Sequence, residues 1–263
     1  MRHHASTSTY SGFEQRWFAA VLLYTVAPIA VVLVYPPRAV DFWWDFAMAI
    51  GATAAGGLAL LPLISARWWA AQQPTTGFLR LVQTAHRELA YIALALVLIH
   101  AGILLVLEGR VVEYLKLGAE DEMLAGLVAA VLVITLVLSS RYREWLRFSY
   151  RGWRRWHVLL SLAALGLLGW HLIGAGYYFT VPSQTIGLVW LLGVPSMLTL
   201  LLRHWPTRPH HRIAPITFPP WRARRLVCAV SLIWLASALW SAWLGSAQSP
   251  LEERALCAVD PCL

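Results

Sequence analysis

Seven long apolar stretches, separated by segments rich in Arg, Pro and charged residues, divide this chain. Each comes close to the roughly 20 apolar residues that an α-helix needs to cross the hydrocarbon core of a bilayer. The pattern predicts seven membrane-spanning helices, at residues 17–35, 46–64, 84–107, 123–140, 153–175, 184–202 and 226–244. None of them shows the period-two alternation of an outer-membrane β-strand. The expected fold class is therefore an all-α integral membrane bundle.

The composition supports this interpretation. Hydrophobic residues make up 59% of the 263 positions and charged residues only 13%, against about a quarter charged in an ordinary soluble domain. A soluble enzyme, a disordered regulator and a disulfide-stapled secreted domain are all excluded by this balance. The first span follows 16 mostly polar residues and has no small-residue cleavage site after it. We interpret it as a retained span rather than a signal peptide.

The basic residues predict the orientation of the bundle. With seven spans, 17 of the 21 Lys and Arg fall on the side of the N-terminus, and such residues stay in the cytoplasm. The N-terminus is thus expected inside and the C-terminus outside, in a membrane that we take to be the bacterial inner membrane. The expected organisation is a cytoplasmic tail (1–16), a six-span core (17–202), a basic, Pro-rich cytoplasmic loop (203–225), an additional seventh span (226–244) and an outer tail (245–263). Whether Cys257 and Cys262 in this tail form a disulfide is left open.

This topology accounts for the net charge of +8, so we expect lipid around the chain and no nucleic-acid partner.

Four of the nine histidines lie inside predicted spans. They are His86 and His100 in the third span and His157 and His171 in the fifth. Both pairs are fourteen residues apart, which is close to a whole number of helical turns and about 21 Å along the axis. Each pair therefore lies on one face of its helix, at two depths.

The third and fifth spans both start inside and end outside, so equal depths face each other. Opposed imidazoles are axial ligands of six-coordinate b-type haem. We predict an inner haem at His86/His157 and an outer haem at His100/His171. A proton relay would need carboxylates at depth, and zinc would be left with half of its tetrahedral shell empty. A haem-free membrane transporter or assembly factor would keep the seven spans and lose the cofactor.

Further candidate cofactor-binding residues flank these histidines. Cationic side chains near the inner pair would neutralise haem propionates, or merely anchor the helices at the cytoplasmic surface, and tryptophans beside the ligands would pack on porphyrin or face lipid. Small residues would let a macrocycle or a neighbouring helix approach. The candidates are Arg87, Arg154, Arg155, Trp156 and Trp170, with Gly102, Gly166, Gly169 and Gly174 as the small residues.

Two of the spans carry a resemblance to a known family. Residues 86–100, HRELAYIALALVLIH, resemble the haem-binding helix of the ferric reductase and NADPH oxidase superfamily. Residues 152–171, GWRRWHVLLSLAALGLLGWH, resemble its other ligand helix, with a basic-Trp lead-in before the first histidine. Ligands on the third and fifth of six core spans also match. The resemblance covers roughly residues 17–202 and implies two b haems that carry electrons across the membrane in single steps, with the four histidines as ligands.

The chain departs from family members that reduce iron or oxygen, because a seventh span stands where they carry a flavin and nicotinamide domain. No GxGxxG cradle is present, so no flavin or nicotinamide is expected in this chain, and the redox partner would be another subunit or a quinone. We predict an electron-transfer subunit of an oxidoreductase complex. The alternatives are a metal or oxygen reductase at the outer face and a quinol-oxidising cytochrome b, although the chain shows no PEWY-like motif.

Overall fold

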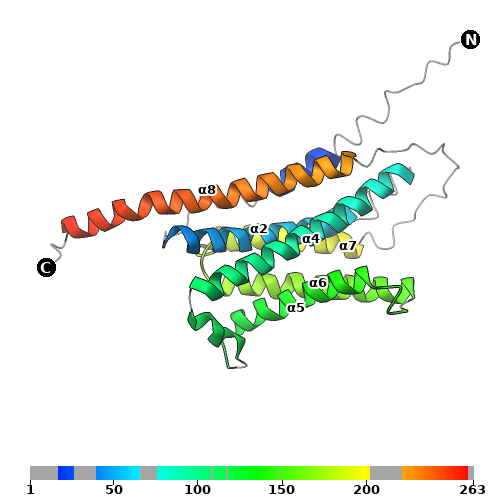
Figure 1. The fold of residues 1–263 in the computed structure, drawn as a ribbon, viewed down its shortest axis with the longest axis horizontal. Helices are drawn as coiled ribbons and strands as arrows, with labels where there is room; N and C mark the ends of the chain where they lie inside the picture. Colours follow the sequence, from blue (N-terminus) through cyan, green and yellow to red (C-terminus); the bar gives the residue numbers. More distant parts are fainter. Residues whose placement is uncertain are drawn as a thin grey trace, which may run out of the picture.

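The computed structural model describes residues 17–26, 40–65, 76–107, 109–116, 118–147, 149–201 and 221–259, and its regular elements there are all helical (Figure 1). A helical segment, Trp17–Val26, is followed by α2 (Phe42–Ser65), α4 (Thr76–Leu107), the 3₁₀ helix η1 (Gly109–Leu115), α5 (Asp121–Arg141), α6 (Tyr150–Gly174), α7 (Pro182–Leu201) and α8 (Trp221–Val259). The predicted all-α membrane bundle is confirmed.

Six of these helices, α2 and α4–α8, are long and apolar enough to cross a membrane, which makes the chain a multi-pass integral membrane protein. Trp17–Val26 is a shorter apolar helix, and the remainder of the first expected span, residues 27–35, lies outside the described residues. The N-terminal tail (1–16), most of the basic loop (202–220) and residues 260–263, with Cys262, lie outside them as well.

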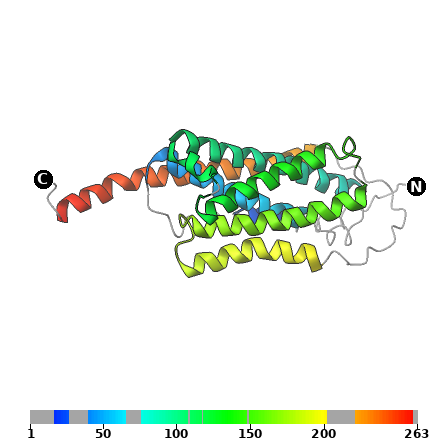
Figure 2. The ribbon, with the colours of Figure 1, turned by 90° about the horizontal axis from the view of Figure 1, so that it is seen from below.

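Two helices extend past the spans expected from hydrophobicity. Helix α4 begins at Thr76 rather than at residue 84. Helix α8 begins at Trp221, inside the expected loop, and continues beyond residue 244 to Val259, inside the expected tail. Figures 1 and 2 show its C-terminal turns projecting beyond the other helices. Apolarity marks only the part of a helix that lies in hydrocarbon, whereas Ala, Arg, Leu and Glu continue a helix into water.

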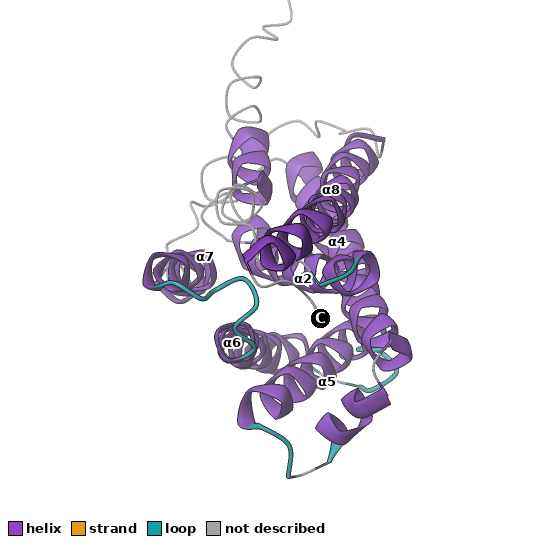
Figure 3. Cartoon of the chain, turned by 90° about the vertical axis from the view of Figure 1, so that its left-hand side faces the viewer, coloured by secondary structure: helices purple, strands orange, loops and turns teal. Residues whose placement is uncertain are grey.

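Helix α2 lies at the centre of the bundle, in contact with α4, α6, α7 and α8 (Figure 3). Its apolar stretch is 56% buried within the protein, against 11–33% for the other five spans. Small residues explain this position, because Gly and Ala let helices approach closely in a membrane, and α2 contains the run Ala54-Ala55-Gly56-Gly57. A buried cluster joins α2 to α4, α8 and the first helical segment through Leu60, Leu89, Val230 and Trp17.

Helices α2 and α4 form one antiparallel pair, and α5 and α6 form a second. The two pairs meet where α4 packs on α5 and where α2 packs on α6. Helix α6 starts at an N-cap, since the side chain of Ser149 accepts a hydrogen bond from the Gly152 N–H. Successive antiparallel helices make α4 and α6 run in the same direction, which is the arrangement that the histidine argument requires.

The close approach of α8 to α2 gives a first prediction. A Cβ atom on Gly57 would lie 2.6 Å from Cη2 of the buried Trp234, so Gly57→Ala forces the two helices apart. We expect a loss of about 1–3 kcal/mol in the free energy of unfolding, measured by thermal unfolding of the purified protein in detergent. Gly102→Ala in α4 is the matched control, because its Cβ meets nothing within 4 Å. Equal melting temperatures for the two variants would contradict this packing.

Candidate functional site

The structure brings the four membrane histidines together as two pairs. Helix α4 carries His86 and His100, and α6 carries His157 and His171. The ring centres of His86 and His157 lie 6.4 Å apart, with 58° between the ring planes. His171 lies near His100. All four side chains are half-buried. We refer below to the 86/157 pair and the 100/171 pair.

The separation within the 86/157 pair suits two imidazoles that bind one metal ion from opposite sides. An imidazole nitrogen binds a first-row metal ion at about 2 Å, and the ring centre lies about 1 Å behind that nitrogen. Two rings on opposite sides of one ion therefore have centres roughly 6 Å apart. The observed 6.4 Å matches this value. The tilt between the planes does not matter, because each ring can rotate about its own bond to the metal.

Each imidazole is held through its Nδ1 by an oxygen atom of a neighbouring helix. His86 Nδ1 is 3.3 Å from the carbonyl oxygen of Leu61, His100 Nδ1 is 2.7 Å from that of Ala47, and His171 Nδ1 is 2.9 Å from that of Glu122. His157 Nδ1 is instead 3.4 Å from Ser140 Oγ. A carbonyl oxygen only accepts, so the Nδ1 opposite it donates and Nε2 keeps its lone pair. This is the arrangement of metal-binding histidines, whose second nitrogen donates to a main-chain or side-chain acceptor.

The spacing of fourteen residues recurs among the acceptors. On α2, the acceptors Ala47 and Leu61 are fourteen residues apart, as are the two histidines of α4 that donate to them. On α5, Leu136 lies fourteen residues after the acceptor Glu122. Each helix pair thus keeps one antiparallel register across both depths, and that register places an oxygen opposite each histidine. The α5–α6 pair repeats the pattern of the α2–α4 pair.

Glycines make room for the rings of the 100/171 pair. A Cβ on Gly51 would lie 2.7 Å from His100 Nδ1, and a Cβ on Gly126 would lie 2.7 Å from His171 Nδ1. Both distances are shorter than any ordinary contact, so a side chain there would push the ring away. Each glycine comes four residues, about one helical turn, after the acceptor of the same ring. The neighbouring helix therefore supplies both the hydrogen bond and the space.

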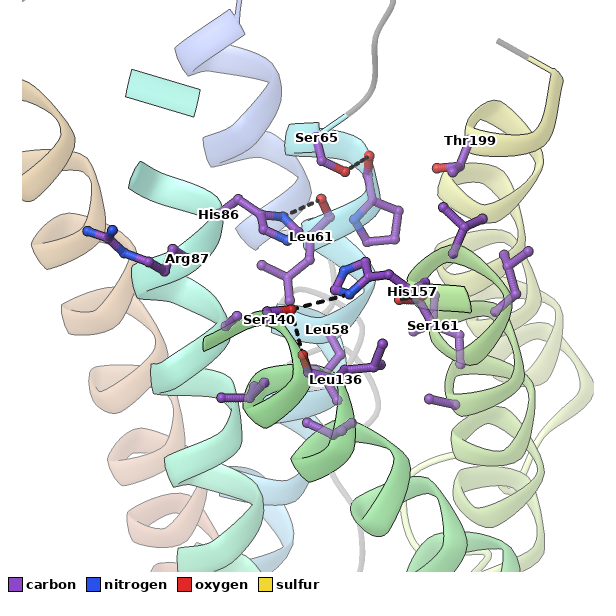
Figure 4. A pocket seen from close by; sticks show the side chains of 18 of the residues that line it. Leu58, Leu61, Ser65, His86, Arg87, Leu136, Ser140, His157, Ser161 and Thr199 are labelled. Carbon is purple, nitrogen blue, oxygen red and sulfur yellow. Dashed lines mark hydrogen bonds between the residues drawn. The ribbon is translucent and has the colours of Figure 1, made fainter. Parts of the chain in front are cut away.

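A cavity of about 290 Å³ opens beside the 86/157 pair. Figure 4 shows both histidines projecting into it from opposite helices, with Leu61, Leu58 and Ser140 around them. Helices α2, α4, α5, α6 and α7 all contribute to its lining, which is mostly apolar. A mostly apolar space next to two opposed imidazoles suits a flat hydrophobic macrocycle.

Trp153 is a lining residue that the sequence reasoning missed. Its ring centre lies 4.9 Å from that of His157, and its Nε1 is buried without a hydrogen-bond partner among the described residues. The indole ring thus forms part of the lining of the cavity. The signal was available, because Trp153 precedes His157 by four residues and so shares its face of the helix. Trp156, the immediate neighbour, is turned about 100° away.

The other expected cofactor-binding residues are placed as follows. Arg87 is a lining residue of the cavity, but its side chain points away from the two histidines (Figure 4), and its guanidinium group forms an exposed ion pair with Glu88 at 2.8 Å. Trp156 and Trp170 are 65% and 60% exposed. The described lining of the cavity includes neither tryptophan and neither of the arginines at positions 154 and 155. Their contact with a cofactor stays a prediction.

A buried carboxyl group closes the end of the bundle near the 100/171 pair. Asp45 in the first turn of α2 is 4% exposed and comes two residues before Ala47, the acceptor of His100. Its Oδ1 accepts hydrogen bonds from the Tyr177 hydroxyl and from the Val40 N–H. Burial, with the bond to Asp45 as a further cause, raises the pKa of Tyr177. Tyr177 therefore stays protonated and donates, which ties α2 to the segment that follows α6.

Residues 50–168 match the family model described as "Ferric reductase like transmembrane component". This stretch is a ferric reductase-like transmembrane domain. It runs from α2 to the last turns of α6 and contains three of the four histidines, ending just before His171. Neither a curated protein nor a solved structure matches the chain.

The family match confirms the resemblance on which part of the sequence analysis rests. Ferric reductase-like transmembrane domains bind haem, and the match supports transmembrane electron transfer. In the described part of the chain, no group of three or more His, Cys, Asp or Glu side chains is arranged to hold a metal ion. Paired imidazoles are enough for haem, however, because the porphyrin supplies the other ligands of its iron.

The tie between Asp45 and Tyr177 gives a second prediction. Tyr177→Phe removes a hydrogen bond from a buried carboxyl group whose other oxygen has no partner among the described residues. We expect the free energy of unfolding to fall by about 1–3 kcal/mol, measured by thermal unfolding in detergent. Tyr114→Phe, at an exposed position of η1, is the control. If both variants melt with the wild type, the hydrogen bond makes no contribution.

Proposed function

We propose that this chain carries single electrons across a membrane through two b-type haems, one held by His86 and His157 and the other by His100 and His171. It acts as a membrane subunit of an oxidoreductase complex, with another subunit or a quinone as its redox partner. The N-terminus lies in the cytoplasm, so the 86/157 pair is the inner pair and the 100/171 pair the outer one. Haem iron supplies one-electron chemistry when it is bound.

The observation that carries this proposal is the common orientation of the four imidazoles. Every Nδ1 has an oxygen partner on a neighbouring helix, which leaves every Nε2 for the partner across the helix interface. Histidines that only hold two helices together would not need the same nitrogen, Nε2, to face the partner histidine in all four cases. The ring separation of 6.4 Å in the 86/157 pair supports the same interpretation.

The surrounding residues hold the four histidine rings in place whatever the redox state of the cofactor. Each ring is held between a hydrogen-bond acceptor and a packed helix face, so a change of charge on the cofactor moves its ligands little. The lining of the 86/157 cavity is mostly apolar, and Nδ1 hydrogen bonds to carbonyl oxygens raise the basicity of the ligands. The two ligand levels are about 21 Å apart along α4 and α6, which divides the passage across the membrane into two sites.

Charged and indole groups would orient the cofactor in the 86/157 cavity. Arg87 lies at the lining and could exchange its ion pair with Glu88 for a haem propionate. The Trp153 ring, next to His157, would pack against the cofactor. Arg154 and Arg155, the next two residues of α6, remain candidates for the propionates, and Trp156 and Trp170 for contacts at the edge of the macrocycle.

The pairing predicts a selective loss of haem. His100→Ala should remove the haem of the 100/171 pair and leave the other, because the ligands of the two sites share no side chain. We expect the purified variant to retain about half of the wild-type haem, judged by the haem-to-protein ratio and by reduced-minus-oxidised spectra of low-spin b haem. His204→Ala, outside the predicted spans, should retain all of it. Loss of both haems or of neither would contradict the pairing, and a wild-type protein without b-haem bands would favour the transporter alternative.

The glycine beside His171 gives a further prediction. Gly126→Ala places a Cβ where it meets the His171 ring at 2.7 Å, so the ring must leave its bond to the carbonyl of Glu122. The haem of the 100/171 pair should then change from low-spin to high-spin or be lost, while the other haem keeps its spectrum. Gly102→Ala serves as the control. An unchanged spectrum in Gly126→Ala would show that His171 is not a ligand.

A further inference from the structure

One of the four histidine anchors differs from the other three. Leu136 occupies on α5 the place, fourteen residues after Glu122, at which the repeated register would offer a carbonyl oxygen to His157. His157 does not bond to that oxygen. Its Nδ1 meets Ser140 Oγ at 3.4 Å, the longest of the four anchoring distances. Ser140 stands fourteen residues after Gly126, so a serine takes the place that glycine has beside His171.

The hydroxyl group of Ser140 lies between the ring and the carbonyl. Ser140 Oγ donates to the carbonyl oxygen of Leu136 at 2.6 Å, and Ser139 Oγ donates to the same oxygen at 3.2 Å. A serine hydroxyl has one proton to donate. Since that proton goes to Leu136, Ser140 can only accept from His157, whose Nδ1 is then the donor. Figure 4 shows this chain of two hydrogen bonds at the edge of the cavity.

The anchors also differ in strength between the two pairs. The 100/171 pair donates over short distances, 2.7 and 2.9 Å, to main-chain carbonyl oxygens. The 86/157 pair donates over 3.3 and 3.4 Å. A shorter bond from Nδ1 to a strong acceptor gives the imidazole more negative character and makes it a more basic ligand. A more basic ligand stabilises ferric iron and lowers its reduction potential.

We propose that Ser140 is a positioning residue that keeps His157 from its carbonyl acceptor and thereby raises the reduction potential of the haem held by the 86/157 pair. The inference rests on the proposed function, because it assigns a role to a residue next to a proposed ligand. Its consequence is that the two chemically identical ligand sets are made unequal. Because its reduction potential is raised, the haem of the 86/157 pair is the one on which an electron shared between the two haems preferentially resides.

Three substitutions at one position test the proposal. Ser140→Gly gives His157 the surroundings of His171, so that its Nδ1 can donate directly to the Leu136 carbonyl oxygen. His157 becomes a more basic ligand, and the reduction potential of the 86/157 haem falls. Ser140→Ala removes the hydroxyl but keeps the Cβ, which at the equivalent position 126 would crowd the ring. His157 then loses its acceptor, and the potential rises. Ser140→Thr keeps a hydroxyl that can bond to the same carbonyl, and should restore the wild-type value.

The measurement is a redox titration of the full chain, followed through the b-haem bands and repeated in a His100→Ala background, where only the 86/157 haem remains. We expect Ser140→Gly to change the equilibrium constant for electron transfer between the two haems by about tenfold. Loss of a hydrogen bond to a metal ligand typically has an effect of this size or larger at metal sites. The potential of the 100/171 haem should not move. Ser139→Gly is the matched control, since it removes a hydroxyl from the same carbonyl without touching His157.

The outcomes separate this inference from the proposed function. If the wild type holds two b haems and neither Ser140→Gly nor Ser140→Ala shifts a potential, or both shift it in the same direction, the role of Ser140 is wrong while the haem pairs stand. If the wild type holds no haem, the proposed function itself fails. If Ser140→Gly does not retain haem, the comparison of Ser140→Ala with Ser140→Thr decides, because a difference between them requires the hydroxyl.

Discussion

The hydrogen bond from a histidine Nδ1 to an oxygen of the adjacent antiparallel helix is the interaction on which the rest of this structure depends. It fixes three things at once: the tautomer of the ring, its orientation toward the partner histidine, and the register of the two helices. Ala47 with His100 and Glu122 with His171 show it at its shortest. A slip of one residue between α2 and α4 would turn the acceptor carbonyl about 100° away and free the ring.

That constraint explains why the bundle is arranged around small residues. An acceptor carbonyl can reach an imidazole only if the two helices are close, and a helix backbone comes close only where side chains are small. Gly51 and Gly126 meet this need at the rings, while the Ala- and Gly-rich body of α2 meets it along the whole helix. The centre of the bundle is therefore built from residues that contribute little apolar surface of their own, and the large side chains lie around it.

The two helix pairs use one design twice. Even Ser140 on α5 has a counterpart in Ser65 on α2, whose hydroxyl group bonds to the carbonyl oxygen of Pro62 rather than to a histidine. Residues 47, 51 and 61 on α2 correspond to 122, 126 and 136 on α5, with the histidines at equal spacing opposite them. Such repetition gives two equivalent ligand sets, and equivalent sets give no preference to an electron. The two histidine pairs still differ, because glycines stand at positions 51 and 126 beside the 100/171 pair and serines at positions 65 and 140 beside the 86/157 pair. Of these serines, Ser140 bonds to a histidine. A polar group of this kind is effective inside a membrane, because no water competes for its hydrogen bonds.

The sequence by itself determined the spans, the four histidines and the levels at which they stand, because a helix of known rise turns residue numbers directly into heights and faces. His86 and His157 were expected at one level, and the structure has them 6.4 Å apart. Of the four glycines expected at close approaches, Gly169 and Gly174 do meet a neighbouring helix, whereas a Cβ on Gly102 or Gly166 meets nothing within 4 Å. Gly51 and Gly126, which were not singled out, lie against the rings. The Nδ1 acceptors were also found only in the tertiary structure. These features depend on which residues of two different helices become neighbours, and that register is set by packing between helices rather than by the periodicity within either one.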